Sequence, residues 1–271
     1  MILFPPCKIN IGLHVLNKRN DGFHALDTLM YPISICDILE VIKSEVFAFT
    51  ASGIAIPGEV QMNICVKAYQ LMVQEYAISP VKIHLHKVIP MGGGLGGGSS
   101  DGTYTLLAIN ALFGLNLSPE RLQELAAVLG SDCPFFVTAS PQIATGRGEF
   151  LESVDISFKG MYLYLVNLGI HVSTAEAFSN VHFYTKESSI VEIINQPFET
   201  IKTELVNSFE TSIFASYPVL EEIKTVFLEN GAIYSAMSGS GSTMFGIFKT
   251  HPEKGMFNNY EVFFEEIVEL I

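Results

Sequence analysis

Positive charge is scarce in this sequence, and the shortage limits the partners that the protein can have. The chain of 271 residues holds 15 lysines and arginines against 28 aspartates and glutamates, which gives a formal net charge of −13. This balance argues against a nucleic-acid partner, because nucleic-acid-binding domains carry basic patches. It also opposes the binding of an anionic nucleotide, so any such site must concentrate positive charge locally. Lysines near a candidate anion site therefore carry particular weight.

Cysteines and long apolar runs are few as well. Four cysteines have no metal-type spacing and are typical of reduced thiols in a cytoplasmic protein: Cys7, Cys36, Cys65 and Cys133. The uncharged run 102–118 is too short for a transmembrane helix and contains glycine and asparagine. The N-terminus lacks the basic region and the long apolar run of a signal peptide. We therefore expect a cytoplasmic protein without membrane contact.

Glycine, in contrast, is concentrated in the stretch 90–101, where six of the seven residues 92–98 are glycine. The preceding residues 81–87 alternate apolar and polar side chains, which predicts a half-buried strand. The following residues 103–113 are rich in helix formers. A strand, a glycine loop and a helix N-terminus together make a phosphate site, because the backbone N–H groups are open to an anion. A flexible linker is the competing interpretation, but linkers seldom lie in so little room.

Several known phosphate loops do not fit this stretch. A Walker A loop requires a lysine after its last glycine, whereas Gly98 is followed by Ser99. The dinucleotide fingerprint is matched almost automatically by so many glycines, and its acidic partner would fall near Glu120, which opens a predicted helix. The His-Arg-Asp and Asp-Phe-Gly signatures of protein kinases are absent.

Three motifs in the expected order resemble those of the GHMP small-molecule kinases, a family that includes galactokinase, homoserine kinase and mevalonate kinase. They are Lys8-Ile9-Asn10, the run Pro-x-Gly-Gly-Gly-Leu-Gly-Gly-Gly-Ser-Ser from Pro90, and Ser-Gly-Ser-Gly-Ser at 238–242. The resemblance implies an α+β fold with an N-terminal domain of the ribosomal protein S5 domain 2-like type at 1–150. It also implies a ferredoxin-like C-terminal domain at 151–271 and an active site between the two. The residue pattern alone predicts only mixed α and β structure.

The resemblance implies that Asp132 is the catalytic base of an ATP-dependent kinase. It also implies that Lys8 keeps this carboxylate ionised and stabilises charge on the transferred group. From the residues alone, Asp132 is more simply a helix N-cap. Lys8 and Asn10 are more simply solvent-facing residues of a strand at 7–16 with one buried face. The family has Ala and Val where this chain has Ser131 and Cys133, two departures that flank the carboxylate.

The cofactors that the resemblance implies are ATP and Mg²⁺, the latter bound through Ser99 or Ser100. Its ATP-binding residues are Asn63, Lys87, Pro90, Met91, Gly92, Gly93, Gly94, Leu95, Gly96, Gly97, Gly98, Ser99 and Ser100. Two of these residues have plain structural alternatives. Asn63 precedes a predicted helix at 64–75 and suits an N-cap, while Lys87 suits a solvated lysine of an edge strand.

A fourth motif, Arg19-Asn20-Asp21-Gly22-Phe23-His24, resembles the Arg-x-Asp-Gly-Tyr-His of one branch of the family. This branch phosphorylates the 2-hydroxyl of 4-diphosphocytidyl-2-C-methyl-D-erythritol in non-mevalonate isoprenoid (terpenoid) biosynthesis. The resemblance implies that His24 reads the cytosine edge and that Phe23 stacks on the base. It adds Asn10, Thr174 and Phe178 to the substrate site, although core packing is a strong alternative for Phe178.

The remaining pattern predicts a helix at 119–129 capped by Ser118 and a hairpin at 144–149. It also predicts strands at 160–166, 232–237 and 243–248, and helices near 198–215, 218–229 and 261–271. Three other functions compete with the branch above: another GHMP kinase acting on mevalonate or homoserine, a nicotinamide dehydrogenase, and a non-catalytic nucleotide-binding protein.

Overall fold

The computed structural model describes residues 1–185, 188–196, 201 and 203–270. The chain forms two compact units, neither of which is continuous in the sequence. The first unit contains Met1–Lys8, Ser34–Met91 and Gly96–Ser140, and the second contains Ile9–Ile33, Gly92–Leu95 and Pro141–Ile271. The glycine stretch 90–101 is therefore divided, with residues 92–95 in the second unit and residues 90–91 and 96–101 in the first. The division near residue 150, which follows chain order, stays a prediction.

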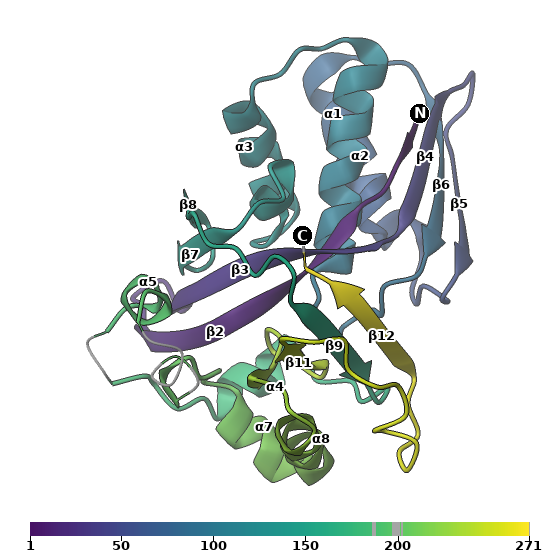
Figure 1. Cartoon of the computed structure of the whole chain (residues 1–271). Helices are drawn as coiled ribbons and strands as arrows, with labels where there is room; N and C mark the ends of the chain where they lie inside the picture. The colour runs from purple at the N-terminus through teal and green to yellow at the C-terminus, as the bar shows by residue number, and fades with distance from the viewer. Residues whose placement is uncertain (186–187, 197–200, 202, 271) are drawn as a thin grey trace. The chain divides into compact units, whose positions relative to one another are not determined.

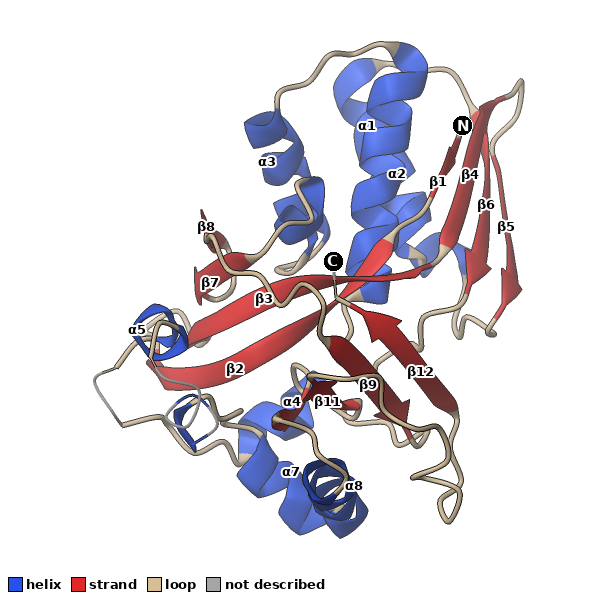
Figure 2. Cartoon of the chain, in the orientation of Figure 1, coloured by secondary structure: helices blue, strands red, loops and turns tan. Residues whose placement is uncertain are grey.

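The first unit is built on a four-stranded sheet with the order β1-β4-β6-β5, in which only the β5–β6 pair is parallel. Its strands are β1 (Ile2–Leu3), β4 (Ile38–Lys43), β5 (Ala48–Gly53) and β6 (Val81–Lys87). Its helices are α1 (Ile64–Tyr76), α2 (Gly97–Phe113) and α3 (Pro119–Leu129), with the 3₁₀ turns η1 (Val60–Met62) and η2 (Cys133–Val137). Helices α1 and α2 lie against one face of the sheet (Figure 2).

The core of this unit follows from the alternation in its strands. Val81, Ile83 and Leu85 of β6 are buried, and so are Leu39 and Val41 of β4. These side chains pack against α1 and α2 in one apolar cluster. β6 is an interior strand of this sheet. The chain leaves it at Lys87 and reaches the glycine stretch three residues later.

The second unit contains two sheets (Figure 1). One has the order β2-β3-β7-β8, from β2 (Pro6–Lys18), β3 (His24–Cys36), β7 (Gln142–Gly146) and β8 (Phe150–Ser153). The other has the order β10-β11-β9-β12, from β9 (Tyr162–Asn167), β10 (Tyr234–Met237), β11 (Met244–Phe248) and β12 (Phe264–Glu269). The described helices are α4 (Thr174–Ser179), α5 (Ile190–Ile194), α7 (Glu210–Ser216) and α8 (Pro218–Glu229).

The second of these sheets has a ferredoxin-like strand order. Read from β12, the strands run fourth, first, third and second in chain order, and neighbouring strands are antiparallel wherever a pair is described. Helix α8 belongs to the first crossover, between β9 and β10. The second crossover, residues 249–263, consists of turns and coil instead of a helix.

Two predictions about secondary structure are wrong. The amphipathic helix expected at 261–271 is instead strand β12, with residue 271 outside the described part of the chain. Its apolar spacing suits a helix, but pairing with β9 over Phe264–Glu269 decides the outcome. The helix expected at 198–215 does not continue through residues 205–209, because Val206 and Ser208 hydrogen-bond to Leu13 of β2. Residues 198–200 and 202 of that prediction lie outside the described residues.

Strand β2 also differs from its prediction, since both of its faces are buried from Cys7 to Val15. The apolar face contributes Leu13 and Val15 to the core of the second unit. On the polar face, the Gly12 N–H donates to the Tyr234 hydroxyl and the His14 ring stacks on Tyr184. The polar residues of this strand are therefore interior residues, which excludes the solvent-facing interpretation of Lys8 and Asn10.

No helix in the described ranges is both long and apolar enough to cross a bilayer.

Candidate active site

A buried lysine and a partly open aspartate meet in the first unit. Lys8 has only 3% of its side chain exposed, and its Nζ lies 3.4 Å from Oδ2 of Asp132, which is 36% exposed. Asp132 precedes η2, but its side chain makes no capping hydrogen bond, so the N-cap interpretation is wrong. A carboxylate that water can reach, held next to a buried ammonium, is suited to accept a proton from a bound alcohol.

The residues around Asp132 fix its position. The Cys133 N–H donates to the Gly130 carbonyl at 3.2 Å, and the Thr103 hydroxyl donates to the Cys133 carbonyl at 2.8 Å. Cys133, Phe135 and Phe136 are fully buried. Cys133 thus fills the small apolar position for which the family uses valine.

Two consecutive glycines lie directly against two lysines. A Cβ atom on Gly96, whose φ is +68°, would lie 3.0 Å from Cε of Lys8. A Cβ on Gly97 would lie 3.0 Å from Nζ of Lys87 and 2.8 Å from Ile89. Helix α2 begins at Gly97, so both cations lie close to its unpaired N–H groups. Each of these cations is paired with aspartate, Lys8 with one carboxylate and Lys87 with two, so the helix N-terminus adds its own partial positive charge to a site where the lysines are already partnered.

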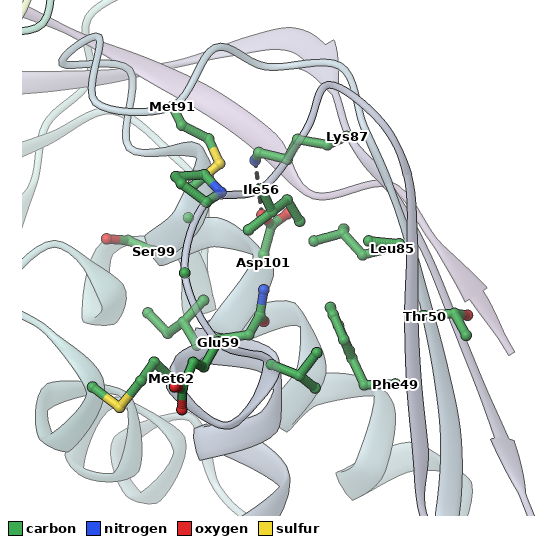
Figure 3. A pocket seen from close by; sticks show the side chains of 17 residues that line it. Phe49, Thr50, Ile56, Glu59, Met62, Leu85, Lys87, Met91, Ser99 and Asp101 are labelled. Atoms are coloured by element: carbon green, nitrogen blue, oxygen red, sulfur yellow. Dashed lines mark hydrogen bonds and ion pairs between the residues drawn. The ribbon is translucent and has the colours of Figure 1, made fainter.

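A cavity of about 500 Å³ opens beside the start of α2 (Figure 3). Five of the predicted ATP-binding residues line it, namely Asn63, Lys87, Met91, Gly98 and Ser99. Much of the remaining wall is apolar and comes from Phe49, Ala51, Ile56, Ile64 and Leu85. This size and lining are typical of a small-molecule site and suit a purine base.

Asn63 caps a helix and also lines this cavity. Its side-chain oxygen accepts a hydrogen bond from the Cys65 N–H at 2.9 Å and thereby caps α1. The same residue lines the cavity wall. The cap therefore fixes the position of this side chain on the cavity wall.

Lys87 is fully buried and forms ion pairs with Asp37 and Asp101, the latter at 2.8 Å. The alternative interpretation of Lys87 as a solvated lysine of an edge strand is therefore excluded, because β6 is an interior strand and the side chain is buried. Burial lowers the pKa of Lys87, but the two carboxylates outweigh it and the net shift is upward. Burial raises the pKa of Asp101, with Lys87 opposing the shift and Asp37 adding to it.

The two serines after the glycines differ in exposure. Ser99 lines the cavity. Ser100 is fully buried, and its hydroxyl has no hydrogen-bond partner within the described ranges. Of the two predicted magnesium ligands, Ser99 is therefore the one whose position on the cavity wall suits a ligand of a bound ion.

In the second unit, the loop 238–242 packs directly on the first glycines of the stretch. The Ser238 hydroxyl donates to the Gly94 carbonyl at 2.9 Å, and the Thr243 N–H donates to the Gly93 carbonyl at 3.2 Å. A side chain on Gly94 would collide with the Ser238 carbonyl. The Asn10 N–H donates to the Ser238 hydroxyl at 3.3 Å, so three of the predicted motifs meet here.

Two residues that the sequence did not single out hold this second loop. Asn207 donates from Nδ2 to the carbonyls of Met237 and Gly239, at 2.8 Å each. Glu210 accepts a hydrogen bond from the Met237 N–H at 2.8 Å. Both residues lie within the predicted helix at 198–215. Nothing in the local sequence indicates that they bind a distant loop.

The predicted substrate residues also lie in the second unit. The His24 ring stacks on Phe178 with centroids 4.6 Å apart, and Phe178 meets Phe209 edge to face. Phe178 is thus both a core residue and a neighbour of His24. Burial, followed by the charge of Lys18, lowers the pKa of His24. The downward shift favours the neutral imidazole, which offers one donor and one acceptor nitrogen.

Phe23 and Thr174 are more open. Phe23 is 52% exposed, and the Arg147 guanidinium lies 4.8 Å from its ring centroid. Thr174 is the exposed first residue of α4. An exposed aromatic ring next to a cation can stack on a base while keeping an anionic ligand close.

Comparisons with known proteins identify the family. The family description "GHMP kinases N terminal domain" matches residues 63–140, and "GHMP kinases C terminal" matches residues 189–255. A Cytophaga hutchinsonii protein named 4-diphosphocytidyl-2-C-methyl-D-erythritol kinase is 46% identical over 93% of this chain and 94% of its own. The protein of the same name from Parabacteroides distasonis is 45% identical over 96% and 97%.

Solved structures show the same fold. A crystal structure of 4-(cytidine 5'-diphospho)-2C-methyl-D-erythritol kinase has a TM-score of 0.77 and 32% identity, covering 91% of this chain and 90% of its own. Methanococcus jannaschii mevalonate kinase has a TM-score of 0.72 over 100% and 98% of the chains, and at 13% identity it shows the fold alone. Together with the glycine stretch on its two lysines, these matches confirm the expected fold, and the chain belongs to the GHMP kinase family.

Proposed function

We propose that this protein transfers the γ-phosphoryl group of ATP to the 2-hydroxyl of 4-diphosphocytidyl-2-C-methyl-D-erythritol, a step of non-mevalonate isoprenoid biosynthesis. The observation that carries the proposal is the pair of Lys8 and Asp132 beside Gly96. The relatives of that name support the choice of substrate, because their identity of 45–46% extends over nearly the whole chain.

Phosphoryl transfer asks the protein for positioning and for positive charge, with little covalent chemistry of its own. In the proposal, backbone N–H groups of residues 93–100 bind the ATP phosphates and the apolar cavity binds adenine. Asp132 accepts the proton of the substrate hydroxyl. Lys8 pairs with that carboxylate and faces the charge that develops on the transferred group.

The donor set fits a magnesium ion that arrives with the nucleotide. Mg²⁺ in kinases is held largely by phosphates and water, so it needs only one or two protein ligands. Ser99 on the cavity wall is the residue that would contact it. Among the described residues, no cluster of three or more histidines, cysteines or acids could hold a metal ion by itself. An ion that is held mainly by phosphates and water does not need such a cluster. When bound, Mg²⁺ would neutralise charge on the phosphate oxygens.

The substrate side of the proposal uses the second unit. His24 reads the cytosine edge, and Phe23 and Phe178 pack on the base. Asn10 and Thr174 bind the remainder of the substrate. The stack of His24 on Phe178 supports this assignment, because it fixes the imidazole plane next to an aromatic surface. The four free cysteines support a cytoplasmic location, and the net charge of −13 supports a small molecule in place of a nucleic acid.

The test is ATP-dependent ADP release by the purified protein with Mg²⁺. Four alcohols are compared in parallel: 4-diphosphocytidyl-2-C-methyl-D-erythritol, methylerythritol phosphate, mevalonate and homoserine. We expect release with the first alone. Release with mevalonate or homoserine instead would retain a GHMP kinase but overturn the role of His24. Silence with all four alongside tight ATP binding would favour a non-catalytic protein.

A further inference from the structure

The aspartate that precedes β4 is bound to the backbone that leads into the glycine stretch. Asp37 is fully buried, and its Oδ1 accepts hydrogen bonds from the N–H groups of Val88 at 2.6 Å and Ile89 at 2.9 Å. These residues lie immediately before Pro90. One carboxylate oxygen therefore fixes the direction in which the chain leaves β6.

The other oxygen of Asp37 accepts from Nζ of Lys87, which also donates to Oδ2 of Asp101 at 2.8 Å. Asp101 is the fifth residue of α2, on the far side of the glycines (Figure 3). Nζ of Lys87 also lies next to Gly97, the first residue of that helix. The ammonium thus connects the residues before the glycines with the helical turn after them.

Burying such a cluster of charges costs free energy. All three side chains are at most 2% exposed, and burying charged groups needs tight pairing and extra hydrogen bonds to offset desolvation. An apolar core would close the same sheet and helix at lower cost. A charged cluster, unlike an apolar core, fixes the orientation of the groups that it joins, because each ion pair and N–H hydrogen bond accepts only a narrow geometry.

We propose that Asp37, Lys87 and Asp101 form a clamp that holds the glycine stretch in its phosphate-binding conformation. The clamp acts through the backbone of residues 88–89 and the first turn of α2, so its members are positioning residues. The inference rests on the proposed function, since it assigns the clamp to the ATP site. It predicts that the clamp governs the binding of the phosphates and leaves the binding of adenosine nearly unchanged.

Equilibrium dialysis with radiolabelled ATP and radiolabelled adenosine tests this on the full chain. The variants are Asp37→Asn, which keeps an acceptor for the backbone but presents an amide to Lys87, and Asp37→Ala, which removes both acceptors. Asp37 is not among the residues that line the cavity, so neither variant changes the wall that adenosine would contact. We expect ATP affinity to fall about tenfold or more, as for the loss of one charge-assisted bond, and adenosine affinity to change by less than about threefold.

The matched control is Leu122→Ala, which removes a buried side chain of α3 from the core of the same unit without touching the clamp. It destabilises the unit generally, and we expect it to keep the ratio of the ATP and adenosine affinities. Equal losses for both ligands in the clamp variants, or no loss in folded variants, would overturn the proposal. Wild-type protein that binds neither ligand would instead overturn the proposed function and the clamp with it.

Amide hydrogen exchange of the wild-type protein gives a second test that needs no variant. The N–H groups of Val88 and Ile89 donate to Asp37, so we expect them to exchange as slowly as the interior of β6. Rapid exchange at both positions would overturn the clamp even if every variant failed to fold.

Discussion

The two buried lysines of the first unit meet aspartates in different ways. Lys87 is enclosed between two carboxylates that are themselves buried, one of them also bound to two backbone N–H groups. Lys8 is equally buried, but its aspartate is one-third exposed and lies at the longer distance of 3.4 Å. Both lysines lie against neighbouring glycines, Gly97 and Gly96.

This difference in exposure indicates that the ion pairs of Lys87 are structural, whereas the pair of Lys8 and Asp132 can take part in a reaction. A carboxylate enclosed by tight partners holds its geometry but cannot exchange a proton with a ligand. A carboxylate with an open side keeps an oxygen for the substrate, while the buried cation behind it stabilises its charge. Exposure of the acid, more than the distance between the charges, distinguishes the two.

The largest effect should come from the pair of Lys8 and the partly exposed Asp132. Asp132→Asn removes the base but keeps the shape of the side chain, so we expect turnover to fall about 10²- to 10⁴-fold. ATP binding should stay near normal, because Asp132 is not part of the cavity wall. Steady-state kinetics and ATP dialysis measure the two effects separately. Turnover at the wild-type rate would show that Asp132 is not the base.

The buried cluster of Asp37, Lys87 and Asp101 should contribute more to the stability of the protein than the pair of Lys8 and Asp132. Lys87→Met leaves two buried carboxyl groups without their cation, and we expect the free energy of unfolding to fall by about 3–5 kcal/mol. Lys8→Met should cost less, because water can solvate the exposed side of Asp132. Urea unfolding of both variants gives the comparison. Equal losses would mean that exposure of the acid does not separate the two pairs.

The glycines can sharpen the comparison further. Gly97→Ala presses a methyl group against Ile89 and Lys87, and we expect a loss of stability of about 1–3 kcal/mol. Gly98→Ala is the matched control, because no atom lies within 4 Å of its added Cβ and alanine favours the helix. It should be neutral or stabilising in the same urea experiment. A stable Gly97→Ala variant would contradict the close approach of Lys87.

The smallest effect concerns the neighbouring serines. Ser100→Ala removes a buried hydroxyl that has no partner in the described part of the chain, so thermal unfolding should be unchanged or shifted slightly upward. Ser99→Ala changes the cavity wall, and we expect it to raise the KM for ATP at limiting Mg²⁺. An unchanged KM across a magnesium titration would remove Ser99 from the ion site.

The sequence could reveal the residues whose chemistry is local. The glycine stretch, the N-caps of α1 and α3 and the hairpin at 142–153 follow from backbone geometry within a few residues. Lys8 and Asp132 were identified by resemblance and were brought together by the fold. The interior position of Lys8 and Asn10 could not be predicted, because it depends on what covers the second face of β2.

Residues that act over long range were missed for the same reason. Asp37 lies 50 positions from Lys87, and Asn207 lies 32 positions from Gly239. Neither has a local signature, since an aspartate between two strands or an asparagine near a helix is ordinary. Strand β12 was predicted as a helix because its apolar residues have helical spacing, and only pairing with the edge of β9 makes this segment a strand.

The contact between Gly94 and Ser238 has a consequence for resistance to inhibitors. Here one main chain lies on another, with no room for any side chain, and the left-handed φ of +79° also favours glycine. A compound that recognises this part of the loop through its backbone would contact atoms that no codon change can remove. Escape mutations would have to arise at other positions that such a compound contacts through side chains.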